Sequence, residues 1–411
     1  MAHCVRLKET LERVAREAIA SLHGARLVER ALGGRAPGAV RVWAVGKAAA
    51  AMAEGAASAL GGELDGGLVI AKADARVDAR LKFFVAAHPL PDERGVIAAR
   101  ALLDDARARH AGERALLLLS GGTSALLAAT VPPATLDTLR AATKALLFGG
   151  ASIGELNVVR RHLGAALGGR LAAATEAALE VLALSDVVGD DPAAIGSGPA
   201  SPDPSTVDDA LEIARRYRLP AEIGAAIAAA GETPKRDHPA FARVHHRILA
   251  SPLALAAVAA EAARAHGLVA VERAGLVEGA LEDFAAELTA AAERLSAGEA
   301  LIAVGEPTVR VRGDGLGGRA QHLALAMARA LAGRGFAFVA CGSDGSDGPT
   351  DAAGGAVDGD TWRDAERRGL APERALARFD AHPLLDAAGA AIRTGSTGTN
   401  LTDLYLLARA A

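Results

Sequence analysis

The sequence predicts a two-domain α/β protein, with a largely parallel sheet in the first domain and a mixed sheet in the second. The chain has 411 residues, more than the roughly 250 to 300 at which a single hydrophobic core stops growing. Short apolar runs alternate with longer alanine-rich stretches, a pattern typical of βαβ units. A polar segment with proline, residues 231–247, interrupts this alternation. We therefore expect domains at residues 1–240 and 241–411.

The strands predicted for the first domain are short runs rich in Val, Leu and Phe, each followed by a turn and a helical stretch. In chain order they are VRVWAV at 40–45, GGLVIAK at 66–72, LKFFV at 81–85, ALLLL at 115–119 and LEVLAL at 179–184. Parallel α/β sheets bind ligands beyond the carboxyl ends of their strands. The turns after these runs are therefore the expected place for a site.

The second domain is predicted to contain a mixed sheet because its strands differ in pattern. In EPTVRVRG, Val309 and Val311 alternate with Arg310 and Arg312, which indicates a half-exposed antiparallel strand. The other strands are expected around 247–249, 269–272, 301–304 and 337–341, and in the terminal run DLYLLARA.

Composition excludes several classes of protein. Lys and Arg number 45 against 49 Asp and Glu, for a formal net charge of -4, and no basic tract is present to neutralise a nucleic-acid backbone. Residues 1–24 show the pattern of an amphipathic helix, not of a signal peptide. The apolar stretches are shorter than the ~18 residues of a membrane span. Cys4 and Cys341 are too few for a disulfide framework, so we expect a cytoplasmic protein. The charge balance and the short apolar stretches predict no nucleic-acid or membrane partner, and a homo-oligomer remains open.

Two turns of the first domain carry signals of an anion site. In LLLLSGGTSALL, residues 116–127, a buried strand runs through a glycine-rich turn into a helix, where free N–H groups attract anions. An ordinary turn whose Ser or Thr caps the helix fits the same spacing. Lys47 follows Gly46 at another strand-to-helix turn, where the helix dipole disfavours a cation unless an anion is bound. Since Ala48 follows the lysine, this is not a P-loop.

A glycine-rich segment in the second domain, RGDGLGGRAQH, matches the dinucleotide fingerprint through Gly313, Gly315 and Gly318. The match is weak, because an amphipathic strand is predicted before it and no acidic residue follows about 20 positions later. We interpret the segment as a mobile loop that brings Arg319 to a helix start, where its guanidinium could bind a carboxylate or phosphate. A solvated surface arginine is the alternative.

Several acidic residues follow predicted strands and are candidate metal ligands. They are Asp186, Asp190, Glu306, Asp344, Asp347 and Asp351. Their spacing is not that of an EF-hand, but carboxylates at strand ends can hold a Mg2+ that bridges substrate phosphates. Some of them are expected only to cap turns. His88 and the pair His245 and His246 lack metal-ligand spacing and are predicted to be structural.

Five motifs occur in order across nearly the whole chain: SGGTSALL, SDVVGDDPAAIGSGPASPDPST, VGEPTVRVRGDGLGGRAQ, GSDGSDGPTDAAGG and TGSTGTNLTDL. Together they resemble the glycerate 2-kinase family, whose C-terminal half is called the MOFRL domain. The resemblance implies a Rossmann-like N-terminal domain, a mixed-sheet MOFRL domain and an active cleft between them. It also implies ATP- and Mg2+-dependent phosphorylation of D-glycerate at its 2-hydroxyl, giving 2-phosphoglycerate.

The resemblance assigns roles to two residues, and we predict roles for others in the same motifs. Lys47 and Arg319 match the family's catalytic cations. Binding of substrate or phosphate is assigned to Ser120, Gly121, Gly122, Thr123, Ser124, Ser197, Gly198 and Glu306. Binding of Mg2+, or orientation of the glycerate hydroxyl, is assigned to Asp186, Asp190, Asp344, Asp347 and Asp351. Ala320 and His322 replace the family's usual asparagine and acid, so no substrate contact is carried over to them.

Two other functions fit parts of the sequence. Some members of the family are named hydroxypyruvate reductase, an activity that needs a nicotinamide site, and the incomplete glycine fingerprint argues against one. A non-catalytic phosphosugar-binding module would require only LLLLSGGTSALL. In such a protein the second, acidic domain would have no function. The sequence therefore favours the kinase.

Overall fold

The computed structural model describes residues 2–34 and 38–411, and within them the side chains from Val5 onward. The described residues form two compact units: residues 24–249, the N-terminal unit, and residues 2–23 with 250–411, the C-terminal unit. This division differs from the sequence-based boundary at 240. The N-terminal unit extends to Leu249 because strand β6 (Val244–Ala250) joins its sheet, whereas the sequence placed that strand in the second domain.

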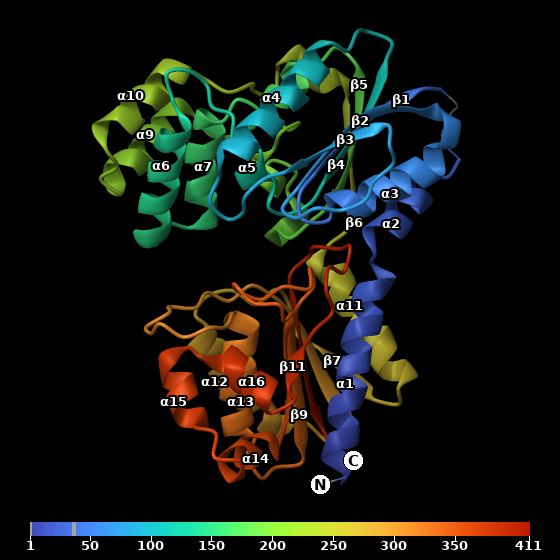
Figure 1. Ribbon diagram of the computed structural model, residues 1–411, viewed down its shortest axis with the longest axis vertical. Helices are drawn as coiled ribbons and strands as arrows, with labels where there is room; N and C mark the ends of the chain where they lie inside the picture. The colour runs from blue at the N-terminus through green and yellow to red at the C-terminus, as the bar shows by residue number, and fades with distance from the viewer. Residues whose placement is uncertain (1, 35–37) are drawn as a thin grey trace. The chain divides into compact units, whose positions relative to one another are not determined.

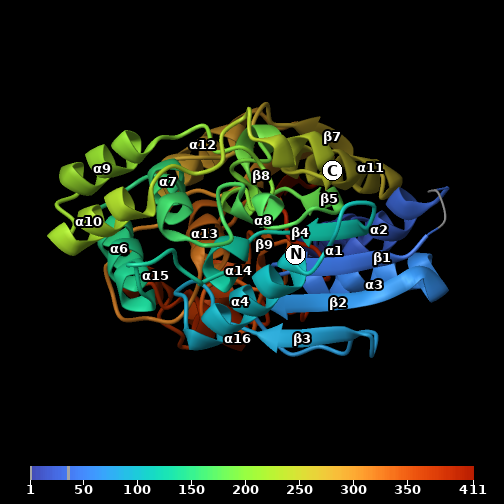
Figure 2. The ribbon, with the colours of Figure 1, turned by 90° about the horizontal axis from the view of Figure 1, so that it is seen from above.

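A six-stranded sheet forms the centre of the N-terminal unit. Besides β6, its strands are β1 (Val40–Val45), β2 (Leu64–Ala71), β3 (Leu81–Val85), β4 (Arg114–Leu119) and β5 (Ala178–Leu184). The order is β3-β2-β1-β4-β5-β6, the pairs from β3 to β5 are parallel, and Figure 2 shows these five strands side by side. The predicted strands and their parallel arrangement are confirmed. β1, β2 and β4 are almost wholly buried, which explains their nearly continuous apolar sequences.

Helices cover both faces of this sheet, with α2 and α3 on one face and α4 and α5 on the other (Figure 1). The helices of the unit are α2 (Gly24–Leu32), α3 (Ala49–Leu60), α4 (Glu93–Arg107), α5 (Thr123–Leu126), α6 (Leu136–Phe148), α7 (Ile153–Leu163), α8 (Arg170–Ala173), α9 (Val207–Arg216) and α10 (Ala221–Ala230). Helices α6, α7, α9 and α10 pack around their own apolar cluster, which includes Leu146 and Leu156. Ser152 begins α7 with a capping box, exchanging hydrogen bonds with Glu155 and so fixing the start of this helix.

The C-terminal unit is built on a second six-stranded sheet. Its strands are β7 (Val269–Glu272), β8 (Glu299–Gly305), β9 (Phe336–Gly342), β10 (Gly354–Asp358), β11 (Ala391–Ile392) and β12 (Asp403–Arg409). The order is β11-β10-β9-β12-β8-β7, in which β7 and β8 are parallel and the other pairs antiparallel. The predicted mixed sheet is therefore confirmed.

The helices of the C-terminal unit include the first helix of the chain. They are α1 (Ala2–Ser21), α11 (Pro252–Ala265), α12 (Leu281–Arg294), α13 (Arg319–Ala330), α14 (Thr361–Arg367), α15 (Pro372–Arg378) and α16 (Ala381–Ala387). Helix α1 packs against α11, β9 and β10 and buries Leu11 and Val14, and Figure 1 shows it along this sheet. Helix α13 packs against β9 and β10. Ala320, Ala324 and Ala328 lie on one side of this helix and are fully buried, and their small side chains allow a close approach.

The prediction of an antiparallel strand at EPTVRVRG is wrong. Only Thr308 in this segment forms a bridge, with Ala280, and residues 309–318 have no regular structure. Val309 packs against the core, whereas Val311 is 63% exposed. The alternating Val and Arg residues therefore belong to a loop in which only Val309 is packed. Conversely, β10 and β11 were not predicted, because GGAVD begins with two glycines and β11 has two residues.

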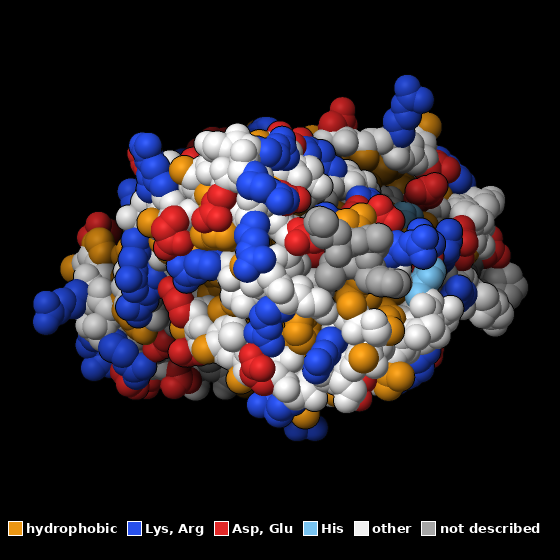
Figure 3. Space-filling view, turned by 90° about the horizontal axis from the view of Figure 1, so that it is seen from below, with side chains coloured by type: hydrophobic (Ala, Val, Ile, Leu, Met, Phe, Trp, Pro, Cys, Tyr) orange, Lys and Arg blue, Asp and Glu red, His pale blue; other side chains and the backbone are white. Residues whose placement is uncertain are grey.

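No described helix has both the length and the apolar character needed to cross a bilayer. Figure 3 shows one face of the molecule, on which basic and acidic side chains are interspersed. Cys341 is a buried free thiol, and burial raises its pKa to about 12. The side chain of Cys4 lies outside the described residues.

Candidate functional site

The strand order of the N-terminal unit reverses between β1 and β4, which lie side by side. In open α/β sheets the carboxyl ends of strands at such a reversal form a crevice that binds ligands. Lys47 comes after β1, separated from it by Gly46, and the turn Ser120–Ser124 begins directly after β4. Two segments that the sequence predicted as anion sites therefore meet at this point of the fold.

Hydrogen bonds join the two turns. Lys47 N donates to Gly121 O at 2.9 Å, and Ala48 N donates to Ser120 Oγ at 3.0 Å. Thr123 Oγ1 donates to the carbonyl at the end of β1 at 3.0 Å. No side chain caps α5, the helix that follows this turn, so the capping role that the sequence left open is absent there, and Ser120 Oγ instead links the two turns.

Gly122 lies next to the side chains of Lys47 and His88. It has a φ of +90°, and a Cβ atom at this position would lie 3.2 Å from the His88 ring and 3.3 Å from Cγ of Lys47. A glycine therefore keeps the turn close to both side chains. His88 was predicted to be structural, whereas its ring borders the candidate site.

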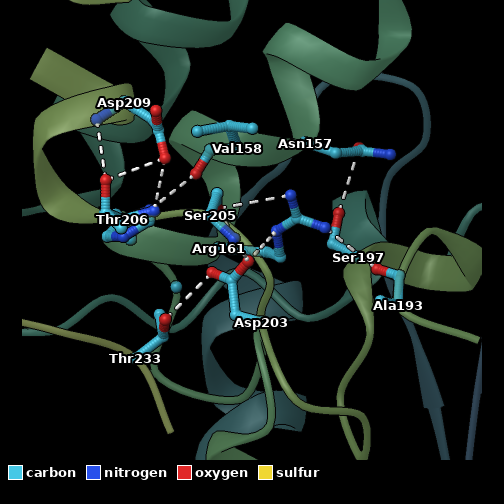
Figure 4. Close-up of polar contacts among 12 residues, drawn as sticks. Asn157, Val158, Arg161, Ala193, Ser197, Asp203, Ser205, Thr206, Asp209 and Thr233 are labelled. Carbon is cyan, nitrogen blue, oxygen red and sulfur yellow. Dashed lines mark hydrogen bonds and ion pairs between the residues drawn. The ribbon is translucent and has the colours of Figure 1, made fainter. Parts of the chain in front are cut away.

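A chain of polar side chains extends from this turn to α7. Ser124 Oγ lies 2.7 Å from Ser197 Oγ, and Ser197 Oγ donates to Asn157 Oδ1 at 3.0 Å. Ser197 is fully buried and has a φ of +60°, a conformation that strains a residue other than glycine. Figure 4 shows Asn157 and Ser197 facing each other. Ser197 and its neighbour Gly198 were predicted as binding residues, whereas Asn157 was not.

Asp186 and Asp190 follow β5 in the same unit. Both are partly buried, and Asp190 has a φ of +54°. Oδ1 of Asp190 is buried and accepts no hydrogen bond from the residues that the structure describes. A buried carboxylate oxygen without a donor is unusual and fits a cation or a ligand hydroxyl.

In the C-terminal unit, Arg319 begins α13 as predicted. Its guanidinium donates to Asp403 through Nε and Nη2, at 2.5 and 3.1 Å, and Nη2 also lies 2.8 Å from Glu306 Oε1. Burial lowers the pKa of Arg319, but the two carboxylates more than offset this effect and raise it above its ordinary value. Tyr405 donates to the same Asp403 carboxylate at 3.1 Å. The sequence missed Asp403, although it lies in the motif TGSTGTNLTDL.

The glycine-rich loop before Arg319 is hydrogen-bonded to the end of α15 and to the residues that follow this helix. Gly315 N donates to Arg378 O at 3.1 Å, and Leu316 N donates to Asp380 Oδ1 at 2.8 Å. Arg378 also pairs with Asp314. No strand precedes these glycines in the described segment, so the strand-turn-helix context of a dinucleotide fingerprint is missing.

The three aspartates of GSDGSDGPTDAAGG have different surroundings. Asp347 is buried and accepts hydrogen bonds from Ala320 N and Gln321 N at the start of α13. Burial and the charge of Asp403 raise its pKa to about 6. Asp344 accepts from Ser346, and exposed Asp351 pairs with Arg393.

The structure brings together some of the predicted residues. Lys47 meets the Ser120–Ser124 turn, Ser124 meets Ser197, and Arg319 meets Glu306. Among the side chains that the structure describes, those of residues 5–34 and 38–411, no three His, Cys, Asp or Glu are grouped to hold a metal ion. The metal-binding roles of the five aspartates stay predictions.

Comparison with family models gives two matches. Residues 10–231 match a family described as a domain of unknown function, DUF4147, and residues 299–403 match the MOFRL family.

Named relatives align over most of the chain. A protein of Thermotoga maritima named D-glycerate 2-kinase is 36% identical over 378 residues, covering 88% of this chain and 89% of the relative. A protein of Agrobacterium vitis, provisionally named hydroxypyruvate reductase, is 35% identical over 420 residues, covering 97% of this chain and 94% of the relative. The crystal structure of glycerate kinase from Thermotoga maritima superposes with a TM-score of 0.86 at 34% identity, covering 98% of this chain and 99% of that one.

Proposed function

The chain belongs to the glycerate kinase family, and we propose that it transfers the γ-phosphoryl group of ATP to the 2-hydroxyl of D-glycerate, giving ADP and 2-phosphoglycerate. The observation that carries this proposal is the position of Lys47 against the Ser120–Ser124 turn, where the strand order reverses between β1 and β4. Phosphoryl transfer depends mainly on positioning and on neutralising charge. A lysine beside a glycine-containing turn supplies both.

Lys47 is proposed to neutralise charge on the transferred group. The hydrogen bond to Gly121 fixes its backbone, and its Cγ lies close to Gly122, so the side chain starts out along the turn. A preorganised cation stabilises charge that develops in the transition state without reorganising during the reaction. We therefore assign Lys47 a role in the chemical step.

Magnesium fits the carboxylates that follow β5. Mg2+ prefers oxygen ligands and commonly uses one or two carboxylates, with water and substrate phosphates as its other ligands. Asp190 offers a buried oxygen that accepts no hydrogen bond from the described residues, and Asp186 lies in the same segment. When bound, the ion supplies charge neutralisation to the phosphates. Asp344, Asp347 and Asp351 remain candidates, but Asp347 uses both oxygens to cap α13.

Arg319 is proposed to bind a carboxylate or phosphoryl oxygen. Asp403 holds two of its nitrogens, whereas Glu306 has a half-exposed side chain that can exchange for an anionic ligand. Asp403 would then keep the guanidinium oriented while Nη2 of Arg319 binds the ligand in place of Glu306.

The direct test incubates the full chain with ATP, Mg2+ and D-glycerate and separates the phosphoglycerate isomers by NMR. We expect ADP and 2-phosphoglycerate, and loss of turnover when EDTA removes Mg2+. A parallel assay with hydroxypyruvate and NAD(P)H, followed at the nicotinamide absorbance band, should show no oxidation. Formation of 3-phosphoglycerate, or hydride transfer without ATP, would contradict the proposal. Binding of phosphosugars without turnover would favour a binding module instead.

The cellular location and assembly of the protein are also proposals. The cytoplasm is favoured by the low cysteine content, and fractionation of cells that produce the protein tests it. Light scattering of the purified chain would show whether it is a monomer or a homo-oligomer.

A further inference from the structure

Arg160, in the last turn of α7, is a buried cation without a protein partner. Its exposed fraction is 9%, and its guanidinium makes no hydrogen bond or ion pair with any residue in the described part of the chain. Burial lowers its pKa to about 10, and no carboxylate raises it again. The side chain therefore remains charged at neutral pH while largely removed from water.

Two neighbouring arginines, the buried Arg161 and the partly buried Arg170, have protein partners. Arg161, the next residue, lies 3.0 Å from Asp203 Oδ1 through Nε and donates to Ala193 O at 3.1 Å. Figure 4 shows this arginine among its partners. Arg170 donates to Arg161 O at 2.5 Å. The unpaired state of Arg160 is therefore not a general property of this region.

The end of the helix does not account for the buried charge. The C-terminal end of α7 carries about half a unit of negative charge from its dipole, and that end is shared by Arg160, Arg161 and His162. Burying an ion without a full counter-charge costs several kcal/mol even after relaxation. Such a cost is usual where a ligand provides the missing charge.

The position of Arg160 connects it with the candidate site. Residues three apart on a helix are neighbours on one face, so Arg160 lies beside Asn157. Asn157 accepts from Ser197, and Ser197 is bonded to Ser124 of the glycine-containing turn. The helix face that carries Arg160 is thus the face that α7 turns toward this polar chain.

We propose that Arg160 binds an oxyanion of a ligand next to the polar chain Ser124, Ser197 and Asn157. The oxyanion is either the carboxylate of the acceptor substrate or a phosphate of the nucleotide. The identity of these ligands rests on the proposed kinase function, whereas the presence of an oxyanion site does not. A guanidinium suits both groups because its planar donors match two oxygens at once.

The test compares Arg160→Met with Arg170→Met in the full chain. Calorimetric titration with D-glycerate, ADP and inorganic phosphate measures affinity, and thermal unfolding without ligand measures stability. Arg160→Met should lose at least about tenfold in affinity for phosphate and for one of the two ligands. A loss for D-glycerate identifies the carboxylate, and a loss for ADP identifies the nucleotide phosphate. Its melting temperature should equal or exceed that of the wild type, because an uncompensated buried charge has been removed.

The matched control should behave in the opposite way. Arg170→Met removes a partly buried arginine that donates to two backbone carbonyls, so it should lower the melting temperature and leave all three affinities unchanged. Arg160→Lys keeps the charge without the planar fork and should show an intermediate loss, which provides a second variant if Arg160→Met does not fold. Wild-type affinities in the Arg160 variants, or a lowered melting temperature without a change in affinity, would overturn the proposal.

Failure of the oxyanion site can be separated from failure of the kinase function. If the wild type binds phosphate through Arg160 but does not phosphorylate glycerate, the oxyanion site stands and the kinase function falls. If the wild type is a kinase and Arg160→Met binds every ligand normally, the reverse holds.

Discussion

Asp403, the first residue of β12, holds Arg319, the first residue of α13, through two hydrogen bonds of 2.5 and 3.1 Å. The bonds fix the guanidinium at the point where the helix begins beside the sheet. Asp403 is buried and also accepts from Tyr405, so its carboxylate cannot easily turn away. Arg319 is therefore held in a defined direction.

Replacing this carboxylate should weaken the chemical step more than nucleotide binding. Asp403→Asn keeps the shape but loses the charge and one acceptor, so we expect kcat to fall roughly 10- to 100-fold with a small change in KM for ATP. Steady-state kinetics measures both. The control is Glu373→Gln, which breaks an exposed pair with Arg329 and should have little effect. An unchanged kcat in folded Asp403→Asn would show that Arg319 does not need this partner.

Lys47→Ala should lower kcat/KM by about three orders of magnitude, because a positioned cation stabilises the charge of phosphoryl transfer. The fold should survive, since the hydrogen bond to Gly121 comes from the backbone of residue 47. Circular dichroism checks the fold and a coupled assay the rate. Lys82→Ala, an exposed lysine on β3, serves as the control. Activity near the wild-type level would remove Lys47 from the reaction.

Gly122→Ala tests whether the turn must stay close to Lys47. Gly122 and Gly112 have nearly equal φ values of +90° and +92°, but only at Gly122 would a Cβ atom contact other residues. Both substitutions should destabilise the protein by about 1 to 2 kcal/mol through backbone strain. Only Gly122→Ala should also reduce kcat/KM, by roughly tenfold or more, because it displaces the lysine stem. Equal activities of the two variants would argue against a close approach at this turn.

Asp347 should make stability depend on pH. Its folded pKa of about 6 lies above the ~3.9 of an unfolded aspartate, so the folded state binds more protons in this range. Stability from this group is therefore lost as pH rises from about 4 through about 6. Relative to Asp347→Asn, the wild type should lose roughly 2 kcal/mol of unfolding free energy between pH 4 and pH 7. Urea unfolding at several pH values measures this difference, and parallel curves for the two proteins would refute the shift.

The sequence predicted most strands of both sheets because their apolar runs are long enough to show a pattern. It failed where the local pattern was misleading, as at Val309 and Val311, whose alternation belongs to a loop. β10 and β11 escaped notice because their hydrogen-bond partners are distant in the chain and their own sequences are short.

The candidate site shows the same limit. Lys47 and the turn Ser120–Ser124 stood out because each occupies a strand-to-helix turn. Asp403 and Arg160 did not, since their significance depends on what surrounds them: Asp403 has Arg319 as its partner, and Arg160 is buried with none among the described residues. Burial and pairing are properties of the folded chain that residue spacing does not encode.

The packing of α1 has a consequence for synthesis. Helix α1 precedes residues 24–249 in the chain, yet the strands against which it packs, β9 and β10, begin only at Phe336. Residues 24–249 can complete their own core in the meantime, since domains generally fold as units during translation. Until β9 and β10 are synthesised, the side of α1 that packs against these strands stays uncovered. A protein truncated before β9 would leave that side exposed, a feature by which quality-control machinery could recognise an incomplete chain.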